Sequence, residues 1–184
     1  MDAMPVIVRD LTDEEAVITM VDSNLQREHI LPSEKAFAYK MKYDALKHQG
    51  TSSQLGTKLR ADELLAQQAG ESRNQVQRFI RLTELISELL DMVDERKLAF
   101  NPAVEVSYLK RDEQRMLLEA MDAEQTTPSL SQAQRLKKFS QEGRLTEEAM
   151  SAIMSEEKKS DMDKVTLRSD TLRRYFPKSY TPKQ

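Results

Sequence analysis

The chain of 184 residues contains no cysteine and no tryptophan, and it has only four glycines. The absence of cysteine excludes disulfide bonds and thiolate metal sites, and it makes the cytosol the expected compartment. No apolar run approaches the roughly 18 residues that a membrane-spanning helix needs, and no signal segment opens the chain. We therefore expect a cytoplasmic protein that has no contact with a membrane.

Charged residues are abundant and nearly balanced in sign. They make up 32% of the chain against 39% hydrophobic residues, which is typical of a helical protein with a modest core and long charged faces. The formal net charge of −3 argues against a protein that coats nucleic acid indiscriminately. It leaves open a local DNA-binding site, because such binding depends on where the charges lie rather than on their sum.

A short run near the start of the chain, Met4–Val8, is rich in β-branched residues and predicts a strand. One strand cannot form a sheet alone, so we expect its partners upstream of Met1. We therefore expect the chain to be the C-terminal part of a longer protein.

The rest of the chain is predicted to be mainly helical. Thr12 and Glu15 have the spacing of a capping box, and Pro32 is a typical first residue of a helix. Residues 23–31 are polar and predict an irregular segment, and Gly70 is one of the residues that separate the later helices. Helices are thus predicted over residues 12–22, 32–50, 60–69, 72–85, 86–97, 102–123, 131–141 and 146–157.

The segment from Asp62 to Arg81 has the spacing of a helix-turn-helix. Ala66 is the small residue at which the second helix crosses the first, and Gly70 is the turn residue that tolerates a positive φ. Val76 supplies the buried apolar position of the second helix. The remaining inward positions are Leu65, Ala69, Phe79, Ile80 and Thr83.

The second helix of this segment has a polar outward face. Ser72 and Gln75 form a capping-box pair that defines its start. At about 100° per residue, one arc of the helix carries only arginine and carboxamide side chains. Such side chains make bidentate contacts with guanine and adenine in the major groove. The predicted DNA-binding residues are Ser72, Arg73, Asn74, Gln77, Arg78 and Arg81, with Lys58 and Arg60 as candidate phosphate contacts.

Upstream of this segment, Ser23-Asn24-Leu25-Gln26-Arg27-Glu28 is followed by Ile30-Leu31-Pro32-Ser33-Glu34-Lys35-Ala36. These residues resemble the third conserved box of ParB-type chromosome and plasmid partition proteins (ParB/RepB-like). The pattern of that box is close to Glu-Asn-x-Gln-Arg-x-x-Leu-x-Pro-x-Glu-x-Ala. A helix-turn-helix follows the box in that family, as it does here. The resemblance covers roughly Val6 to Leu98.

The resemblance implies a function in chromosome or plasmid partition. Proteins of this family bind a centromere-like double-stranded DNA site as homodimers. Their N-terminal domain binds CTP with magnesium, which converts the dimer into a clamp that slides along DNA. A ParA-type ATPase then moves the complex. A protein of this kind is associated with the nucleoid or with a plasmid.

The same resemblance assigns nucleotide-binding roles by position. Asn24 would ligate the magnesium of the triphosphate, and Gln26 and Arg27 would line the nucleotide pocket. This chain departs from the family pattern at this site in two ways. Ser23 replaces the acidic residue of the family box. The glycine- and arginine-rich phosphate box of the family would lie before Met1. We therefore expect no cofactor and no enzymatic activity in this chain, and CTP with Mg²⁺ only in the full-length protein.

The expected fold is mainly α. It is a helical bundle with a helix-turn-helix DNA-binding domain, preceded by a remnant (strand plus helices) of a ParB-type N-terminal α/β domain. We assign residues 1–32 to this remnant of the nucleotide-binding domain and 33–125 to the DNA-binding domain. Residues 126–157 are expected to form additional helices, and residues 158–184 a charged linker or tail.

Other interpretations of the same residues remain open at this point. The protein could use the helix-turn-helix on an operator as a transcriptional regulator. It could instead be a helical adaptor that binds protein, in which case the polar face is only solvated and no duplex DNA is bound. His29 and His48 are interpreted as surface residues and not as metal ligands.

Overall fold

The computed structural model describes residues 8, 10–25, 27, 29–52 and 60–156. These residues are mainly helical, as predicted, and this part of the chain contains no strand. The predicted strand Met4–Val8 lies outside the described residues except for Val8, which is exposed and belongs to no regular element. The predicted tail 158–184 also lies outside them. The described residues form nine helices: α1 (Asp13–Leu25), α2 (Pro32–Ser52), α3 (Ala61–Ala69), α4 (Arg73–Leu82), α5 (Ser87–Asp94), α6 (Phe100–Val106), α7 (Arg111–Glu124), α8 (Leu130–Gln141) and α9 (Glu147–Met154).

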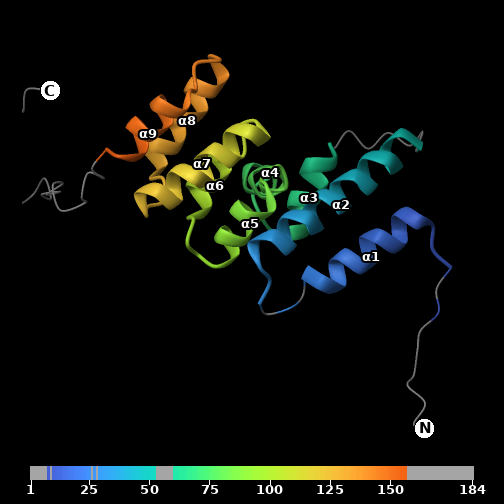
Figure 1. Ribbon diagram of the computed structural model, residues 1–184. Helices are drawn as coiled ribbons and strands as arrows, with labels where there is room; N and C mark the ends of the chain where they lie inside the picture. The colour runs from blue at the N-terminus through green and yellow to red at the C-terminus, as the bar shows by residue number, and fades with distance from the viewer. Residues whose placement is uncertain (1–7, 9, 26, 28, 53–59, 157–184) are drawn as a thin grey trace, which may run out of the picture.

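The helices follow one another across the molecule, with α1 beside α2 at one end and α8 beside α9 at the other (Figure 1). Helix α4 lies near the middle, where Figure 1 shows it almost end-on, and it contacts α2, α3 and α6. None of the helices in the described part of the chain combines the length and apolar character that crossing a membrane requires. This arrangement puts α4 at the junction between the two halves of the bundle.

Two hydrophobic clusters form the core. The larger one lies mainly among α5, α6, α7, α8 and α9, with Ala36 of α2 and Leu82 of α4, and includes fully buried Leu89 and Leu136. The smaller one joins α2, α3 and α4 through Tyr39, Leu65 and Val76. Phe79 of α4 packs against both clusters. Burial of apolar surface on two sides therefore determines the orientation of α4.

Helix α1 is longer than the sequence predicted. The Thr12–Glu15 capping box is present, because each residue's backbone N–H is bonded to the other's side-chain oxygen, at 2.9 and 3.3 Å. The helix continues through Leu25, so the prediction of an irregular segment beginning at Ser23 is wrong. Leu25 packs against the smaller cluster, and this burial outweighs the weak helix propensity of the polar residues before it.

The prediction of one helix over residues 102–123 is wrong, because α6 and α7 are separate helices. The carbonyl of Ser107 accepts a hydrogen bond from Arg81 Nη2 at 2.7 Å, and that of Leu109 accepts one from Gln114 Nε2 at 3.0 Å. These side chains bond carbonyl groups that a continuous helix would bond internally. Tertiary hydrogen bonds thus stabilise a break that no glycine or proline marks.

Candidate nucleic-acid interface

Helices α3 and α4 are joined by a tight turn. Gly70 ends α3 with φ 65° and ψ 23°, the left-handed conformation that glycine adopts without strain. The N–H of Glu71 donates to the carbonyl of Ala66 at 3.1 Å. Ser72 precedes α4 in an extended conformation, and its Oγ accepts the N–H of Gln75 at 3.2 Å. The positive φ at Gly70 and the cap at Ser72 are both confirmed.

Replacing Gly70 with alanine is expected to lower the free energy of unfolding by about 1 kcal/mol, because an L-residue is strained at positive φ. A Cβ at this position would meet no atom within 4 Å, so the cost is conformational and not steric. Gly143 has φ 66° and equally open surroundings, which makes Gly143→Ala a matched control with the same expected loss. Urea denaturation measures both. Equal stability of Gly70→Ala and the unsubstituted protein would contradict the prediction.

Three of the predicted inward positions of this pair of helices are buried, and the other four, Ala69, Phe79, Ile80 and Thr83, are half-buried. Leu65 of α3 and Val76 of α4 are completely buried, and Ala66 between them is 6% exposed. The small side chain of Ala66 lets the two helices approach closely at their crossing. These contacts keep one flank of α4 inside the protein.

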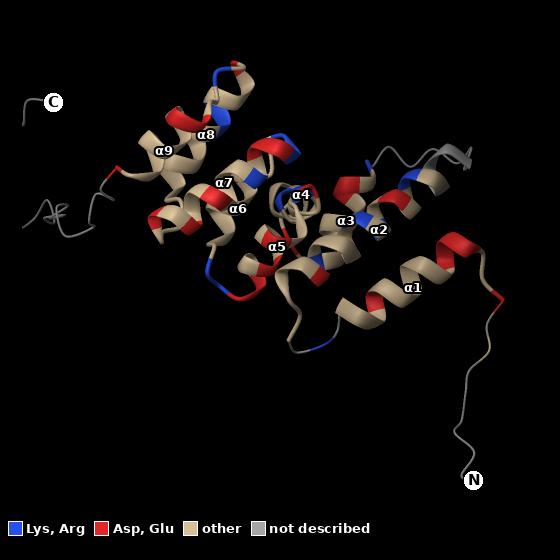
Figure 2. Cartoon of the chain, viewed as in Figure 1, with Lys and Arg blue, Asp and Glu red and all other residues tan. Residues whose placement is uncertain are grey.

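The opposite flank of α4 is polar, and the helix contains no acidic residue. Figure 2 marks the basic residues of α4 in blue near the middle of the molecule. Ser72, Arg73, Asn74 and Gln77 are exposed, whereas Arg78 is half-buried. Exposure of these side chains at one end of α4 leaves them available to a partner outside the protein. The first half of α4 therefore offers guanidinium and carboxamide groups together.

Arg81 differs from the predicted arrangement. Its guanidinium is half-buried, it donates to the carbonyl of Ser107 at 2.7 Å, and it lies 4.3 Å from the centroid of the Tyr108 ring. Lys137 of α8 lies 3.7 Å from the same ring. Arg81 thus ties α4 to the segment after α6 and does not project freely, because the backbone carbonyl and the aromatic ring engage it.

Arg78 is also engaged by neighbouring residues. One of its amino groups, Nη2, donates to the side-chain oxygen of Asn101, and its guanidinium lies 5.1 Å from the centroid of the Phe100 ring. Both partners belong to the first turn of α6, so they hold the arginine at the edge of the polar flank. Sequence spacing does not indicate Asn101 as part of the site, since only the fold brings α6 to α4.

Asp62 is the main residue that the sequence analysis missed. Its side chain is 3% exposed, and its Oδ2 accepts hydrogen bonds from Arg73 Nε at 2.5 Å and from Gln77 Nε2 at 3.4 Å. Arg60 Nε lies 3.3 Å from its Oδ1. Burial by itself would raise the pKa of Asp62, but the hydrogen bond from Arg73 and the charges of both arginines lower it below its usual value. An acid in a first helical turn is common, so its sequence position did not signal this role.

The structure describes one of the two candidate phosphate contacts, Arg60. The side chain of Arg60 is 65% exposed. Arg60 precedes α3, and its Nε lies 3.3 Å from Oδ1 of Asp62. Lys58 lies outside the described residues, and its role stays a prediction.

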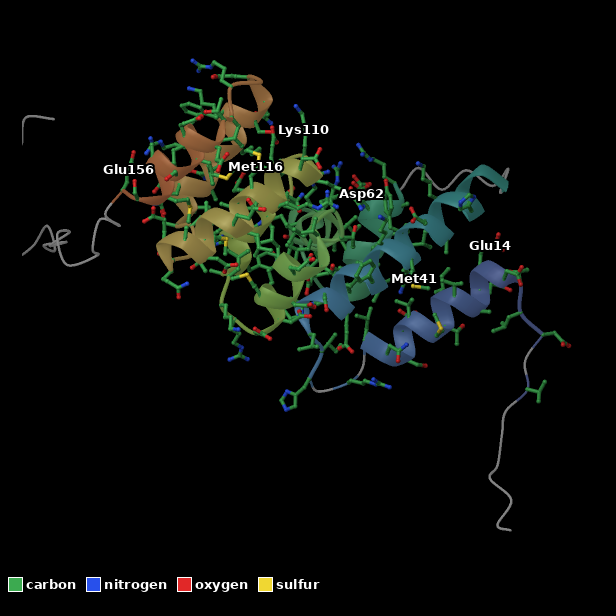
Figure 3. The ribbon with its side chains drawn as sticks, in the orientation of Figure 1. Glu14, Met41, Asp62, Lys110, Met116 and Glu156 are labelled. Atoms are coloured by element: carbon green, nitrogen blue, oxygen red, sulfur yellow. The ribbon has the colours of Figure 1, made fainter. Side chains whose placement is uncertain are left out.

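The proposed nucleotide residues lie upstream of this interface, at the end of α1 and before α2. Asn24 is exposed in the last turn of α1, and the N–H of the exposed Arg27 donates to its carbonyl at 3.3 Å; Gln26 lies outside the described residues. Asn24 and Arg27 border an apolar pocket between α1 and α2. Phe37 and Met41 are among its lining residues (Figure 3 labels Met41). No group of three or more metal-ligating side chains occurs in the described residues. Asn24 and Arg27 offer one carboxamide and one guanidinium to a nucleotide, and their role in binding it stays a prediction.

Comparison with known proteins gives a consistent set of relatives, although no family model matches the chain. The chain is 30% identical over 124 residues to a nucleoid occlusion protein of Listeria monocytogenes. It is 35% identical over 100 residues to a probable chromosome 1-partitioning protein ParB of Deinococcus radiodurans, and 33% over 91 residues to the chromosome-partitioning protein Spo0J of Thermus thermophilus. These matches cover 67%, 54% and 50% of this chain, but only 39%, 30% and 29% of the relatives. The chain thus spans well under half the length of the curated relatives it matches.

Proposed function

Because this chain belongs to the ParB-type family of partition proteins, we propose that it binds a specific double-stranded DNA sequence. In this proposal α3 and α4 are a helix-turn-helix, and α4 is the recognition helix. The observation that carries the proposal is the exposed, acid-free flank of α4, where Arg73, Asn74 and Gln77 lie together above a buried apolar flank. These are the side-chain types that bind guanine and adenine edges in two-pronged hydrogen bonds.

The geometry suggests how α4 meets the duplex. Its exposed polar residues lie in its first half, which is the half that enters the major groove in helix-turn-helix proteins. Ser72 caps this end, and Arg60 lies beside it, where it can contact a phosphate. Arg81, at the other end of α4, is held by Ser107 and stabilises the position of the helix. Base contacts are therefore assigned to Arg73, Asn74, Gln77 and the half-buried Arg78.

Selection of bound duplexes from a random library, followed by sequencing, tests the proposal. Arg73→Ala and Gln77→Ala are each expected to reduce discrimination at their own base pairs. Each lost bidentate pair should cost about 1–3 kcal/mol of discrimination, roughly 5- to 150-fold in relative affinity.

Two exposed residues on other helices supply controls with the same substitutions. Arg115→Ala on α7 and Gln134→Ala on α8 remove the same side chains away from α4, and the selected sequence should not change. Enrichment of no sequence by the unsubstituted protein would contradict the proposal. Identical selected sequences for Arg73→Ala, Gln77→Ala and the unsubstituted protein would contradict the assignment of the groove contacts.

The family relationship supports further proposals for the whole protein. We propose that it acts as a homodimer on a palindromic, centromere-like site, associates with the nucleoid and works with a ParA-type ATPase. This chain is proposed to act by binding and not as an enzyme. CTP with Mg²⁺ is proposed only for a protein that adds further phosphate-binding groups to Asn24, Gln26 and Arg27. Nucleotide binding by a longer protein that includes the preceding domain is the measurement that tests this.

A further inference from the structure

Three side chains that the proposed function assigns to DNA converge on one buried carboxylate, that of Asp62 at the start of α3 (labelled in Figure 3). Arg73 approaches from the first position of α4, and Gln77 from one turn further along. Arg60 approaches from the residue before α3 and completes the cluster. The side chain of Asp62 is only 3% exposed, so in this structure it faces these side chains and not the solvent.

The contact with Asp62 engages the guanidinium of Arg73 at its inner nitrogen, Nε. Asp62 binds the Nε–H of Arg73 at 2.5 Å, while Nη1 lies 3.8 Å from a carboxylate oxygen of Glu63. A guanidinium is planar, so a bond at Nε determines the direction in which its two amino groups point. Arg73 then loses less conformational entropy when it binds a base, because its orientation is already set.

The charge of Asp62 has a second effect. Non-specific binding to DNA is almost entirely electrostatic and depends on the number of phosphates that basic side chains neutralise. The carboxylate compensates part of the positive charge of Arg60 and Arg73, and it repels any phosphate that approaches them. It therefore weakens contacts that do not require a particular sequence.

We propose that Asp62 is a positioning residue that sets the DNA selectivity of this protein. It orients Arg73 and Gln77 for base contacts and limits the strength of their purely electrostatic contacts. The inference rests on the proposed function, and it adds a residue that does not touch DNA to those that determine which sequence is bound.

Asp62→Asn tests the inference, since it removes the charge and keeps the size of the side chain. Affinity should be measured at two salt concentrations for the selected duplex and for a random duplex of equal length. We expect affinity for the random duplex to rise about threefold, with a steeper salt dependence, because one more cation contacts phosphate. Affinity for the selected duplex should fall, so that the ratio of the two affinities drops about tenfold or more.

One control variant, one measurement of folding and one alternative variant accompany this test. Asp122→Asn removes the same charge from an exposed position on α7 and should leave the ratio unchanged. Thermal unfolding shows whether each variant is folded at the temperature of the binding assay. Asp62→Ser supplies a second variant with the same expected result if Asp62→Asn does not fold.

A double-mutant comparison separates positioning from general stability. If Asp62 acts through Arg73, Asp62→Asn should change the affinity ratio much less in an Arg73→Ala background than alone. An unchanged ratio in Asp62→Asn, or a parallel fall of both affinities, would overturn the inference while leaving the proposed function intact. Absence of sequence preference in the unsubstituted protein would overturn the proposed function, and this inference with it.

Discussion

Replacing Phe79 with alanine is expected to lower the free energy of unfolding by about 3 kcal/mol. The ring of Phe79 meets the ring of Tyr39 edge-on at a centroid distance of 5.7 Å and that of Phe100 at 4.8 Å. Lys35 Nζ lies 4.7 Å from its centroid. Truncation of a core phenylalanine typically costs about 3–5 kcal/mol, and the lower end applies because Phe79 is only partly buried. The loss is expected to be large because both hydrophobic clusters lose a contact.

Denaturant unfolding followed by circular dichroism measures this loss. Phe37→Ala is the matched control, because Phe37 lies on α2 with 48% of its surface exposed and should cost well under half as much. If the two substitutions had equal effects, Phe79 would not be the residue that joins the two clusters. The prediction also concerns the proposed interface, since Phe79 is part of α4 and helps to determine its orientation.

Replacing Gln114 with leucine is expected to have an effect of similar size, a loss of about 3 kcal/mol. The buried amide of Gln114 accepts the N–H of Ile86 at 2.8 Å and donates to the carbonyls of Glu84 and Leu109 at 3.2 and 3.0 Å. Leucine has a similar volume but cannot form these bonds, so three backbone groups lose their partner. Each buried backbone group without a partner costs about 1–3 kcal/mol, and access of water to Glu84 keeps the total near the lower limit.

Gln134→Leu supplies the control for this second prediction. Gln134 lies exposed on α8, where leucine should change the free energy of unfolding by less than about 0.5 kcal/mol. The comparison uses the same denaturant titration at one pH and salt concentration. A Gln114→Leu protein as stable as Gln134→Leu would show that the amide does not hold α7 against the segment between α4 and α5.

Features determined by neighbouring residues were predictable. The Thr12–Glu15 box, the Ser72 cap and the turn at Gly70 each depend on residues within four positions of one another, so their hydrogen bonds can be inferred from spacing. The inward position of Val76 followed from helical periodicity in the same way. Local geometry was sufficient because the partners of these groups lie within the same turn or cap.

The break between α6 and α7 was not predictable for the opposite reason. Its carbonyls are bonded by Arg81, which lies 26 residues before Ser107, and by Gln114. No glycine or proline marks the break. The only local signal among its neighbours is Glu113, whose carboxylate caps the N–H of Lys110 at 2.8 Å, and this does not by itself show where α6 ends. The end of α1 was mispredicted for a related reason, since burial of Leu25 lengthens the helix beyond its polar residues.

The candidate interface contains features that neighbouring residues determine and features that depend on tertiary packing. Helical periodicity correctly predicted that Arg73, Asn74 and Gln77 are exposed, because the direction of a side chain follows from its place in the turn. It could not show that Arg81 is held by Ser107, since that contact depends on where α6 packs. The role inferred for Asp62 was equally invisible, because Arg73 and Gln77 reach it only after α4 has packed across α3.

By itself, the sequence determined the helical character of this protein, the turn between α3 and α4 and the chemical character of the α4 flank, because hydrogen bonds within four residues and helical periodicity specify them. Only the tertiary structure decided which acceptor or ring each arginine of α4 contacts. Long side chains have many conformations, and those of Arg73, Arg78 and Arg81 are selected by an acceptor or a ring that lies ten or more residues away.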